Sequence, residues 1–289
     1  MKTIKPSFIK PLSTYQFWLL TLAGALIAVD ISLNIKLARD IIAPSLSLLL
    51  WSVILSKLWE KRHTLSLNSD IFSSLLGLVL IAFVLVRSLV TVRISLLLDF
   101  LPVISALALI LLASGIKGFN QYRQELLLIL VLNISDSLLG KVFDPSNLTA
   151  RFATYIMSCF GFKAVLQGIN IVTNAGTVAV LPGCSGLVNM LFLWQLAILF
   201  IVTFPANLAK KNYVPVVAVS VGFIFNAARV ALLTVLITNS QEKAFEYWHD
   251  GDGSQIFVIM SVLVFGAFCY FLIETDEPAN PDSREYPDK

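Results

Sequence analysis

The sequence predicts an all-α polytopic membrane protein with about eight transmembrane helices. Of its 289 residues, 57% are hydrophobic and only 13% are charged, and the mean hydropathy is +0.83. About a quarter of the residues are charged in an average soluble domain, so this chain has too few charges to cover a water-exposed surface. Most of its surface must therefore face lipid.

The number of helices comes from apolar stretches long enough to cross a bilayer. About 20 residues are needed, because the hydrocarbon core is about 30 Å thick and a helix rises about 1.5 Å per residue. The first stretch is too long for the core of a signal peptide, so we expect it to be retained. The fifth is short and contains Asn133, Ser135, Asp136 and Ser137. The eight stretches lie approximately at residues 15–35, 41–58, 71–91, 95–116, 125–140, 187–204, 214–238 and 254–273.

Eight spans place both termini on one side of the membrane. The positive-inside rule makes that side the cytoplasm, because the inner segments then hold twelve Lys and Arg residues and the outer segments eight. The connections Lys57 to Arg62 and Lys210–Lys211 argue most strongly for this choice. We expect a single integral domain over residues 1–273 in the cytoplasmic (inner) membrane, followed by a polar, flexible cytoplasmic tail at 274–289.

The longest interruption between apolar stretches, about residues 141–186, precedes the sixth helix and falls on the outer side. Its first part, Arg151 to Gln167, predicts an interfacial amphipathic helix. The part from Ile169 to Val180 is rich in β-branched residues and has a turn signal at Asn174 to Gly176, which predicts a small β-hairpin. The sequence thus predicts a small extracytoplasmic insertion of hairpin and amphipathic helix.

Charge and residue counts exclude several classes of function. The net charge of +3 is small and dispersed, so we expect no nucleic-acid partner. The three cysteines lack CxxC spacing, and two histidines are too few for a histidine-based zinc site. Asp250 and Asp252 lack the ligand pattern of an EF-hand. We therefore expect neither a metal nor a cofactor.

Cys184 follows Leu181-Pro182-Gly183 at the start of the sixth apolar stretch. Pro and Gly end the strand and the apolar run restarts as a helix, so Cys184 is expected near a helix N-terminus. There the helix dipole lowers the pKa of a thiol, and N–H groups near Ser185 could bind a developing oxyanion. The alternative is a small residue in a tight turn.

Arg229 lies in the seventh apolar stretch, on the same helical face as Gly222 and Asn226. A membrane arginine costs at least about 2.5 kcal/mol and normally points into the helix bundle. In the expected topology Arg229 lies roughly 13 Å from the outer end of its helix, within reach of the outer surface. The alternative is an ion pair with a membrane carboxylate: Asp30, Asp99 or Asp136.

His249 lies in the outer segment between the seventh and eighth stretches. Imidazole can transfer protons near neutral pH, although a loop histidine can also simply be solvated. Since Cys184, Arg229 and His249 all reach the outer side under one topology, together they predict a thiol acyl-transfer site. His63 falls on the inner side, and Cys159 and Cys269 are expected to be packing residues.

These residues resemble the motifs of the exosortase/archaeosortase family of polytopic membrane enzymes. The resemblance rests on Gly183-Cys184-Ser185-Gly186-Leu187, on Phe225-Asn226-Ala227-Ala228-Arg229, and on His249 followed by Gly251 and Gly253. It covers about residues 100–273, the expected catalytic part, and suggests the cyanoexosortase branch. Leu181-Pro182-Gly183 stands where many members carry a polar or acidic residue before the cysteine.

The resemblance implies a cysteine protease and transpeptidase at the outer (periplasmic) face. Its partners would be exported proteins that end in a PEP-like motif, a transmembrane helix and a basic tail, together with an acceptor for the new carboxyl end. Cys184 would be the nucleophile, Arg229 would stabilise the oxyanion and His249 would transfer protons. Asn226 is expected to orient Arg229, and Asp250 is a candidate to orient His249.

Two other classes of function stay open at this level. The first is a transporter in which Arg229 and a membrane Asp form a substrate or ion pathway, although neither broken midplane helices nor paired repeats stand out. The second is a structural assembly subunit, in which all three residues would tolerate alanine.

Overall fold

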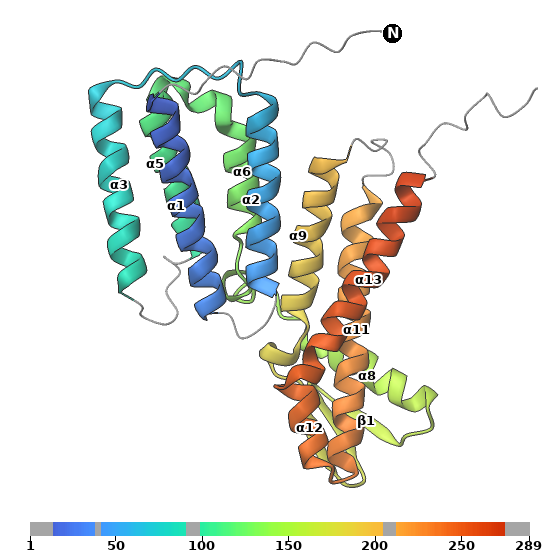
Figure 1. Cartoon of the computed structure of the whole chain (residues 1–289). Coiled ribbons are helices and arrows are strands. Elements are labelled where there is room, and N and C mark those ends of the chain that lie inside the picture. The colour runs from blue at the N-terminus through green and yellow to red at the C-terminus, as the bar shows by residue number, and fades with distance from the viewer. Residues whose placement is uncertain (1–13, 38–41, 91–98, 205–211, 275–289) are drawn as a thin grey trace, which may run out of the picture. The chain divides into compact units, whose positions relative to one another are not determined.

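The computed structural model describes residues 14–37, 42–90, 99–204 and 212–274, which fall into two compact units (Figure 1). One unit takes in Met1–Arg39 and Ala43–Ile134, and the other Asp40–Ile42 and Ser135–Lys289. We call them the N-terminal and the C-terminal unit. The single domain expected over residues 1–273 stays a prediction, and residues 275–289 of the expected tail and Lys210–Lys211 lie outside the described residues.

The regular elements among the described residues of the N-terminal unit are all helices. α3 begins after Asp70, whose carboxylate accepts a hydrogen bond of 3.1 Å from the N–H of Ser73 and so caps the helix. α3 and α5 pack closely at Gly77, where a Cβ would lie 2.8 Å from the carbonyl oxygen of Ala108. The elements are α1 (Thr14–Leu37), α2 (Ile42–Glu60), α3 (Ile71–Leu89), α5 (Leu101–Ser114), the 3-10 helix η1 (Ile116–Tyr122) and α6 (Arg123–Leu132).

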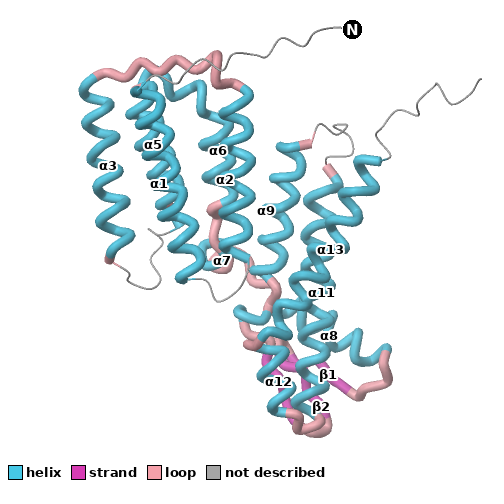
Figure 2. The backbone as a smooth tube through the Cα atoms, viewed as in Figure 1, coloured by secondary structure: helices cyan, strands magenta, loops and turns pink. Residues whose placement is uncertain are grey.

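The described residues of the C-terminal unit form three packed apolar helices with a smaller cap at one end. The apolar helices are α9 (Leu187–Thr203), α11 (Tyr213–Thr238) and α13 (Asp252–Glu274). The cap gathers at the C-terminal end of α11, and Figure 2 shows that the strands belong to it. Its elements are α8 (Ser146–Cys159), β1 (Ala164–Gln167), β2 (Asn170–Thr173), β3 (Gly176–Ala179) and α12 (Glu242–His249), and the short α7 (Asp136–Leu139) precedes them.

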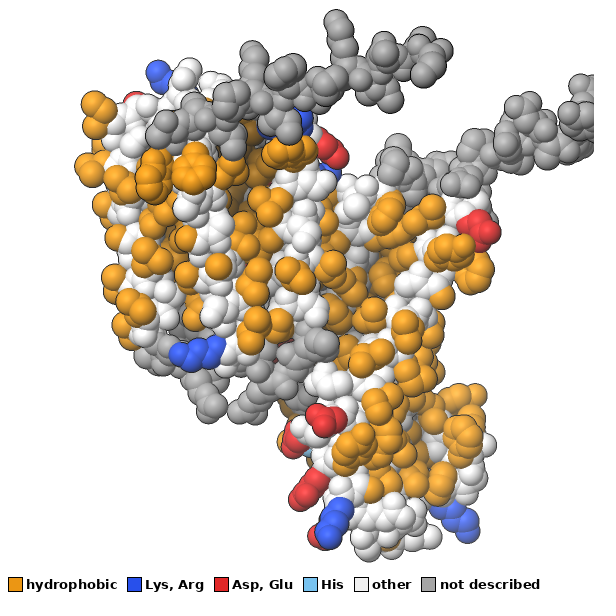
Figure 3. Space-filling model, viewed as in Figure 1, with side chains coloured by type: hydrophobic (Ala, Val, Ile, Leu, Met, Phe, Trp, Pro, Cys, Tyr) orange, Lys and Arg blue, Asp and Glu red, His pale blue; other side chains and the backbone are white. Residues whose placement is uncertain are grey.

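Five described helices are long and apolar enough to cross a membrane: α1, α2, α3, α11 and α13. Two more apolar helices, α5 and α9, coincide with predicted spans but are shorter, at 14 and 17 residues. Figure 3 shows hydrophobic side chains over much of the visible helical surface of each unit. Several membrane spans are therefore supported, whereas the predicted number of eight is not confirmed.

The fifth predicted span, residues 125–140, is interrupted. α6 ends at Leu132, and the Asn133 side chain donates a hydrogen bond of 2.8 Å to the carbonyl oxygen of Ile129. The chain starts again as α7 only at Asp136. Polar side chains that bond to nearby main-chain groups compete with helix propagation, so the polar residues of this stretch break the helix.

The insertion before α9 differs in part from its prediction. The predicted hairpin is confirmed: β2 and β3 are antiparallel with Thr173 opposite Gly176. The amphipathic helix α8, however, ends at Cys159, and Ala164–Gln167 forms strand β1, which pairs with β2. Gly161 adopts a left-handed φ of 81° just after α8, and Ala164 and Leu166 alternate inward onto the core. Buried side chains therefore alternate every two residues along Ala164–Gln167, as in a strand, and do not follow the spacing of a helix.

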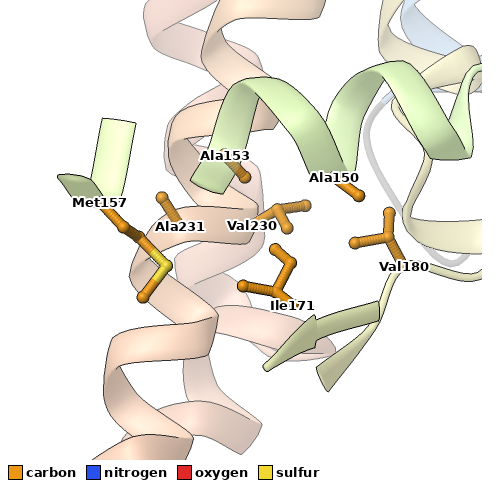
Figure 4. Close-up of a cluster of buried hydrophobic side chains, with 7 residues drawn as sticks. All are labelled: Ala150, Ala153, Met157, Ile171, Val180, Val230 and Ala231. Atoms are coloured by element: carbon orange, nitrogen blue, oxygen red, sulfur yellow. The ribbon is translucent and has the colours of Figure 1, made fainter. Parts of the chain in front are cut away.

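The cap is held to α11 by a small apolar core (Figure 4). Ala150, Ala153 and Ile171 in this core are completely buried. Small residues let α8 approach the other elements closely, and the last turns of α11 are therefore enclosed by the cap. The core consists of Ala150, Ala153 and Met157 of α8, Ile171 and Val180 of the sheet region, and Val230 and Ala231 of α11.

Candidate active site

Cys184 lies in a short turn, residues 181–186, which we call the nucleophile turn. Pro182–Cys184 form the 3-10 helix η2, in which the N–H of Cys184 donates to Leu181 O at 2.8 Å. The N–H of Ser185 donates to Pro182 O at 3.2 Å. α9 begins only at Leu187, so Cys184 precedes the helix rather than forming part of its first turn.

The side chain of Ser185 stabilises this turn by hydrogen bonds to its main chain. Its hydroxyl donates to Pro182 O at 2.7 Å and accepts a hydrogen bond of 3.4 Å from the N–H of Leu187. Ser185 is 1% exposed. Its own N–H donates to Pro182 O, and the expectation that N–H groups near Ser185 bind an oxyanion stays a prediction.

Two residues from other helices bind the main chain of the turn. Asn226 Nδ2 of α11 donates to Cys184 O at 3.0 Å, and Thr149 Oγ1 of α8 donates to Ser185 O at 2.6 Å. Asn226 was expected to orient Arg229, but its bonded partner is the nucleophile turn. A buried carbonyl that loses its donor costs about 1–3 kcal/mol, so both contacts stabilise the turn.

Gly186 lies directly against Asn226. Its φ of 88° is left-handed, and a Cβ at this position would lie 2.5 Å from Asn226 Nδ2. Backbone conformation and close approach both require glycine here. The second glycine of Gly183-Cys184-Ser185-Gly186 thus allows Asn226 to reach the carbonyl of Cys184.

His249, the last residue of α12, faces Cys184. The distance from Cys184 Sγ to His249 Nε2 is 3.3 Å, and His249 Nδ1 lies 3.0 Å from Asp250 Oδ2. The Phe245 ring stacks on the imidazole at 5.0 Å and 13°. Asp250 therefore does contact the outer ring nitrogen, although its side chain is 88% exposed and water weakens its electrostatic effect.

Arg229 binds the end of α12 that carries His249. Its Nη2 donates to His249 O at 2.6 Å and its Nε donates to Trp248 O at 3.3 Å. A cation at a helix C-terminus is favourable, because the last carbonyl groups carry partial negative charge. The N-terminal unit satisfies Asp30 separately, through Ser47 Oγ at 2.6 Å and Trp51 Nε1 at 2.8 Å. Arg229 therefore finds its hydrogen-bond partners at the site, whereas Asp30 is bonded to other residues.

α12 is joined to α13 by a very short link, Asp250–Gly251. The N–H groups of both link residues donate to Glu246 O, at 3.0 and 3.1 Å. A Cβ on Gly253, in the first turn of α13, would lie 2.7 Å from the ring of Tyr247. Trp248 also packs edge-on against Phe257 of α13. The end of α12 that carries His249 is therefore packed against the first turns of α13 through Tyr247 and Trp248.

The environment of Cys184 favours the neutral thiol. Burial raises its pKa, the positive charge of Arg229 acts in the opposite direction, and Asp250 raises it further. The expected lowering by a helix N-terminus is wrong, because α9 starts three residues later and the desolvation of a half-buried sulfur outweighs the other effects. A base is needed to remove the proton, and His249 Nε2 is within contact distance.

The position of the site follows from the helices that form it. Gly222 of α11 packs against the start of α9, and Asn226, one turn later, meets the nucleophile turn. Arg229 lies almost one turn beyond, where α11 enters the cap. The site thus lies where the apolar helices meet the cap.

Two further residues of the site, Thr149 and Phe245, are not among those predicted from the sequence. Phe245 is four residues before His249 on one helix, a spacing that predicts contact. No sequence pattern points to Thr149, because it bonds to a residue 36 positions away. Within the described residues, no group of three or more His, Cys, Asp or Glu side chains is arranged to hold a metal ion.

In a comparison with protein families, the chain matches the transmembrane exosortase family over residues 42–266. The matched range begins earlier than the resemblance seen in the sequence and includes α2, α3 and α5. It also contains Cys184, Arg229 and His249, but it does not distinguish a cyanoexosortase branch. No curated protein and no solved structure matches the chain.

Proposed function

Because the chain belongs to the transmembrane exosortase family and is a multi-pass membrane protein, we propose that it is a cysteine protease and transpeptidase. It cleaves the C-terminal sorting signal of exported proteins through a thioester and transfers the new carboxyl end to an acceptor. The observation that carries the proposal is the 3.3 Å contact between Cys184 Sγ and His249 Nε2.

In the first step His249 Nε2 takes the proton of the Cys184 thiol, and the sulfur attacks the carbonyl carbon of the scissile peptide bond. The negative charge moves to the carbonyl oxygen, where the charge of Arg229 stabilises it. Burial of the thiol explains why a base in direct contact is required. Asp250, 3.0 Å from Nδ1, can accept a hydrogen bond from this nitrogen and so orient the ring with Nε2 toward the sulfur.

In the second step the carbon–nitrogen bond breaks, and the imidazolium gives its proton to the leaving amine. This releases the part of the signal that contains the anchoring helix, while the exported protein stays on Cys184 as a thioester. His249 then removes a proton from the acceptor nucleophile, which attacks the thioester carbonyl and returns the sulfur to the thiol.

We further infer that the protein lies in the cytoplasmic membrane with both termini in the cytoplasm and the site at the outer face. The support is the excess of Lys and Arg in the inner segments together with the position of the site at the cap. The substrate would combine a PEP-like motif, one transmembrane helix and a basic tail, so that the bond before its helix reaches the same boundary.

The proposal is tested by co-expressing the full chain with a tagged sorting-signal protein. Cys184→Ala should abolish processing, whereas Cys159→Ala, which removes an exposed cysteine, should leave it unchanged. With the wild-type chain, hydroxylamine should release the tagged protein from a covalent adduct. Full processing by Cys184→Ala would refute the proposed chemistry.

A further inference from the structure

We propose that Thr149 is a positioning residue for Cys184, through which helix α8 fixes the geometry of the nucleophile turn. The inference rests on the function proposed above. It also predicts that loss of the Thr149 hydroxyl changes the reactivity of the Cys184 thiol, which can be measured without any substrate.

The contact of Thr149 is unusual for a helical threonine. Such hydroxyl groups commonly bond to the carbonyl four residues earlier on their own helix, as Thr154 does with Ala150 O at 2.8 Å. Thr149 instead donates to Ser185 O at 2.6 Å and is 0% exposed. Its hydroxyl therefore serves a contact between elements.

Thr149 and Asn226 hold two successive peptide groups from opposite partners. Asn226 binds the carbonyl of Cys184 from α11, and Thr149 binds the carbonyl of Ser185 from α8. A peptide group is planar, so fixing each carbonyl fixes the orientation of its whole plane. The plane after Cys184, held by Asn226, and the plane before it, held by the Cys184 N–H bond to Leu181 O, together set the direction in which the Cys184 side chain leaves the main chain. The Thr149 bond fixes the next plane and so keeps the plane after Cys184 in place.

α8 is well placed to act as the reference for this geometry. Its start is held by Asp144, whose carboxylate accepts hydrogen bonds from the N–H and the hydroxyl of Ser146 at 3.0 and 2.6 Å. These bonds hold the pKa of Asp144 below its usual range, so the contact persists at neutral pH. One helix therefore carries both a fixed N-terminus and the donor to the nucleophile turn.

The inner face of α8 also contacts two segments next to site residues, one before the nucleophile turn and one after Arg229. Its small residues pack against Val180, just before the nucleophile turn, and against Val230, just after Arg229 (Figure 4). The Cys184 side chain itself packs on this cluster. A shift of α8 would consequently displace Cys184 relative to His249, and the proton transfer across 3.3 Å is sensitive to such a shift.

The experiment compares three variants of the full chain in lipid nanodiscs. Thr149→Val keeps the shape but removes the donor, Thr149→Ser keeps the donor, and Thr154→Val removes a hydroxyl that bonds only within α8. Thr149→Val should lower kcat for a sorting-signal substrate about 10-fold with little change in KM. It should also change the pH profile of Cys184 alkylation by a small thiol reagent. Thr149→Ser and Thr154→Val should stay close to wild type.

Unaltered kcat and alkylation in folded Thr149→Val would overturn the proposal, as would a loss that Thr154→Val reproduces. If Thr149→Val does not fold, Thr149→Ala is measured in its place, and failure of both to fold would assign the hydroxyl to folding instead. Since alkylation needs no substrate, a changed profile in Thr149→Val supports the positioning role even if Cys184→Ala shows that the proposed processing is wrong.

Discussion

The guanidinium of Arg229 donates a hydrogen bond of 2.6 Å to the carbonyl oxygen of His249. Together with the bond to Trp248 O, it clamps the end of α12 to α11. One cation thus fixes the main chain that carries the candidate base and also contributes positive charge near the candidate nucleophile.

This double role predicts that lysine cannot replace arginine at position 229. Lysine keeps the charge but lacks the planar fork that reaches two carbonyl groups at once. Arg229→Lys should lower kcat about 10-fold, and Arg229→Gln about 10²-fold, because the latter also removes the charge. Rates of processing of a tagged substrate check this. Equal activity of Arg229→Lys and wild type would show that the charge alone matters.

The buried thiol predicts a specific pH dependence. The pKa of Cys184 is raised, so its alkylation should increase with pH through a midpoint above the range of a free thiol, about 8.5. Asp250→Asn removes a negative charge that raises this pKa, and should move the midpoint down slightly. Arg229→Gln removes a charge that lowers the pKa, and should move the midpoint up. The measurement uses a chain in which Cys159 and Cys269 are replaced by alanine.

A midpoint at or below that of a free thiol would contradict the prediction. It would show that, without substrate, the contact with His249 lowers the pKa of Cys184 by more than burial raises it.

Gly186 predicts a steric effect that can be separated from chemistry. Gly186→Ala adds a Cβ 2.5 Å from Asn226 at a left-handed φ, and should reduce the free energy of unfolding by about 2 kcal/mol or more. Gly183→Ala is the matched control, because its Cβ would have no heavy atom within 4 Å. Thermal unfolding in detergent compares the two. Equal melting temperatures would show that the turn adapts easily.

The expectation that α8 lies in the membrane interface can be tested with a native reporter. Cys159 ends α8 and is exposed beside Tyr155 and Phe160, which are 64% and 78% exposed. A fluorophore on Cys159, with the other cysteines replaced, should be quenched by lipids that carry a spin label near the headgroup. The same fluorophore on Lys243→Cys of α12 serves as the comparison. Quenching equal to that of a fully solvated dye would place α8 in water.

Much of the site could be predicted because membrane topology constrains where distant residues meet. The apolar stretches placed Cys184, Arg229 and His249 at one boundary, and the structure brings Cys184 to His249 and His249 to Arg229. The hairpin was predictable from the turn at Asn174 to Gly176, since turn chemistry is local.

The remaining features depend on tertiary structure. The partner of Asn226 and the role of Thr149 are set by hydrogen bonds between residues 42 and 36 positions apart. The pKa of Cys184 depends on burial, which its position near α9 does not reveal. The fifth predicted span did contain a local warning in Asn133 and its polar neighbours, and the helix breaks there.

Because the Asp250–Gly251 link is so short, His249 and the apolar helix α13 are expected to move together. With only two residues between His249 and Asp252, and aromatic rings wedged against the first turn of α13, sliding or tilting of that helix carries the imidazole along. A change in bilayer thickness, or a substrate helix that packs against α13, would therefore change the distance between Cys184 Sγ and His249 Nε2 by moving α13.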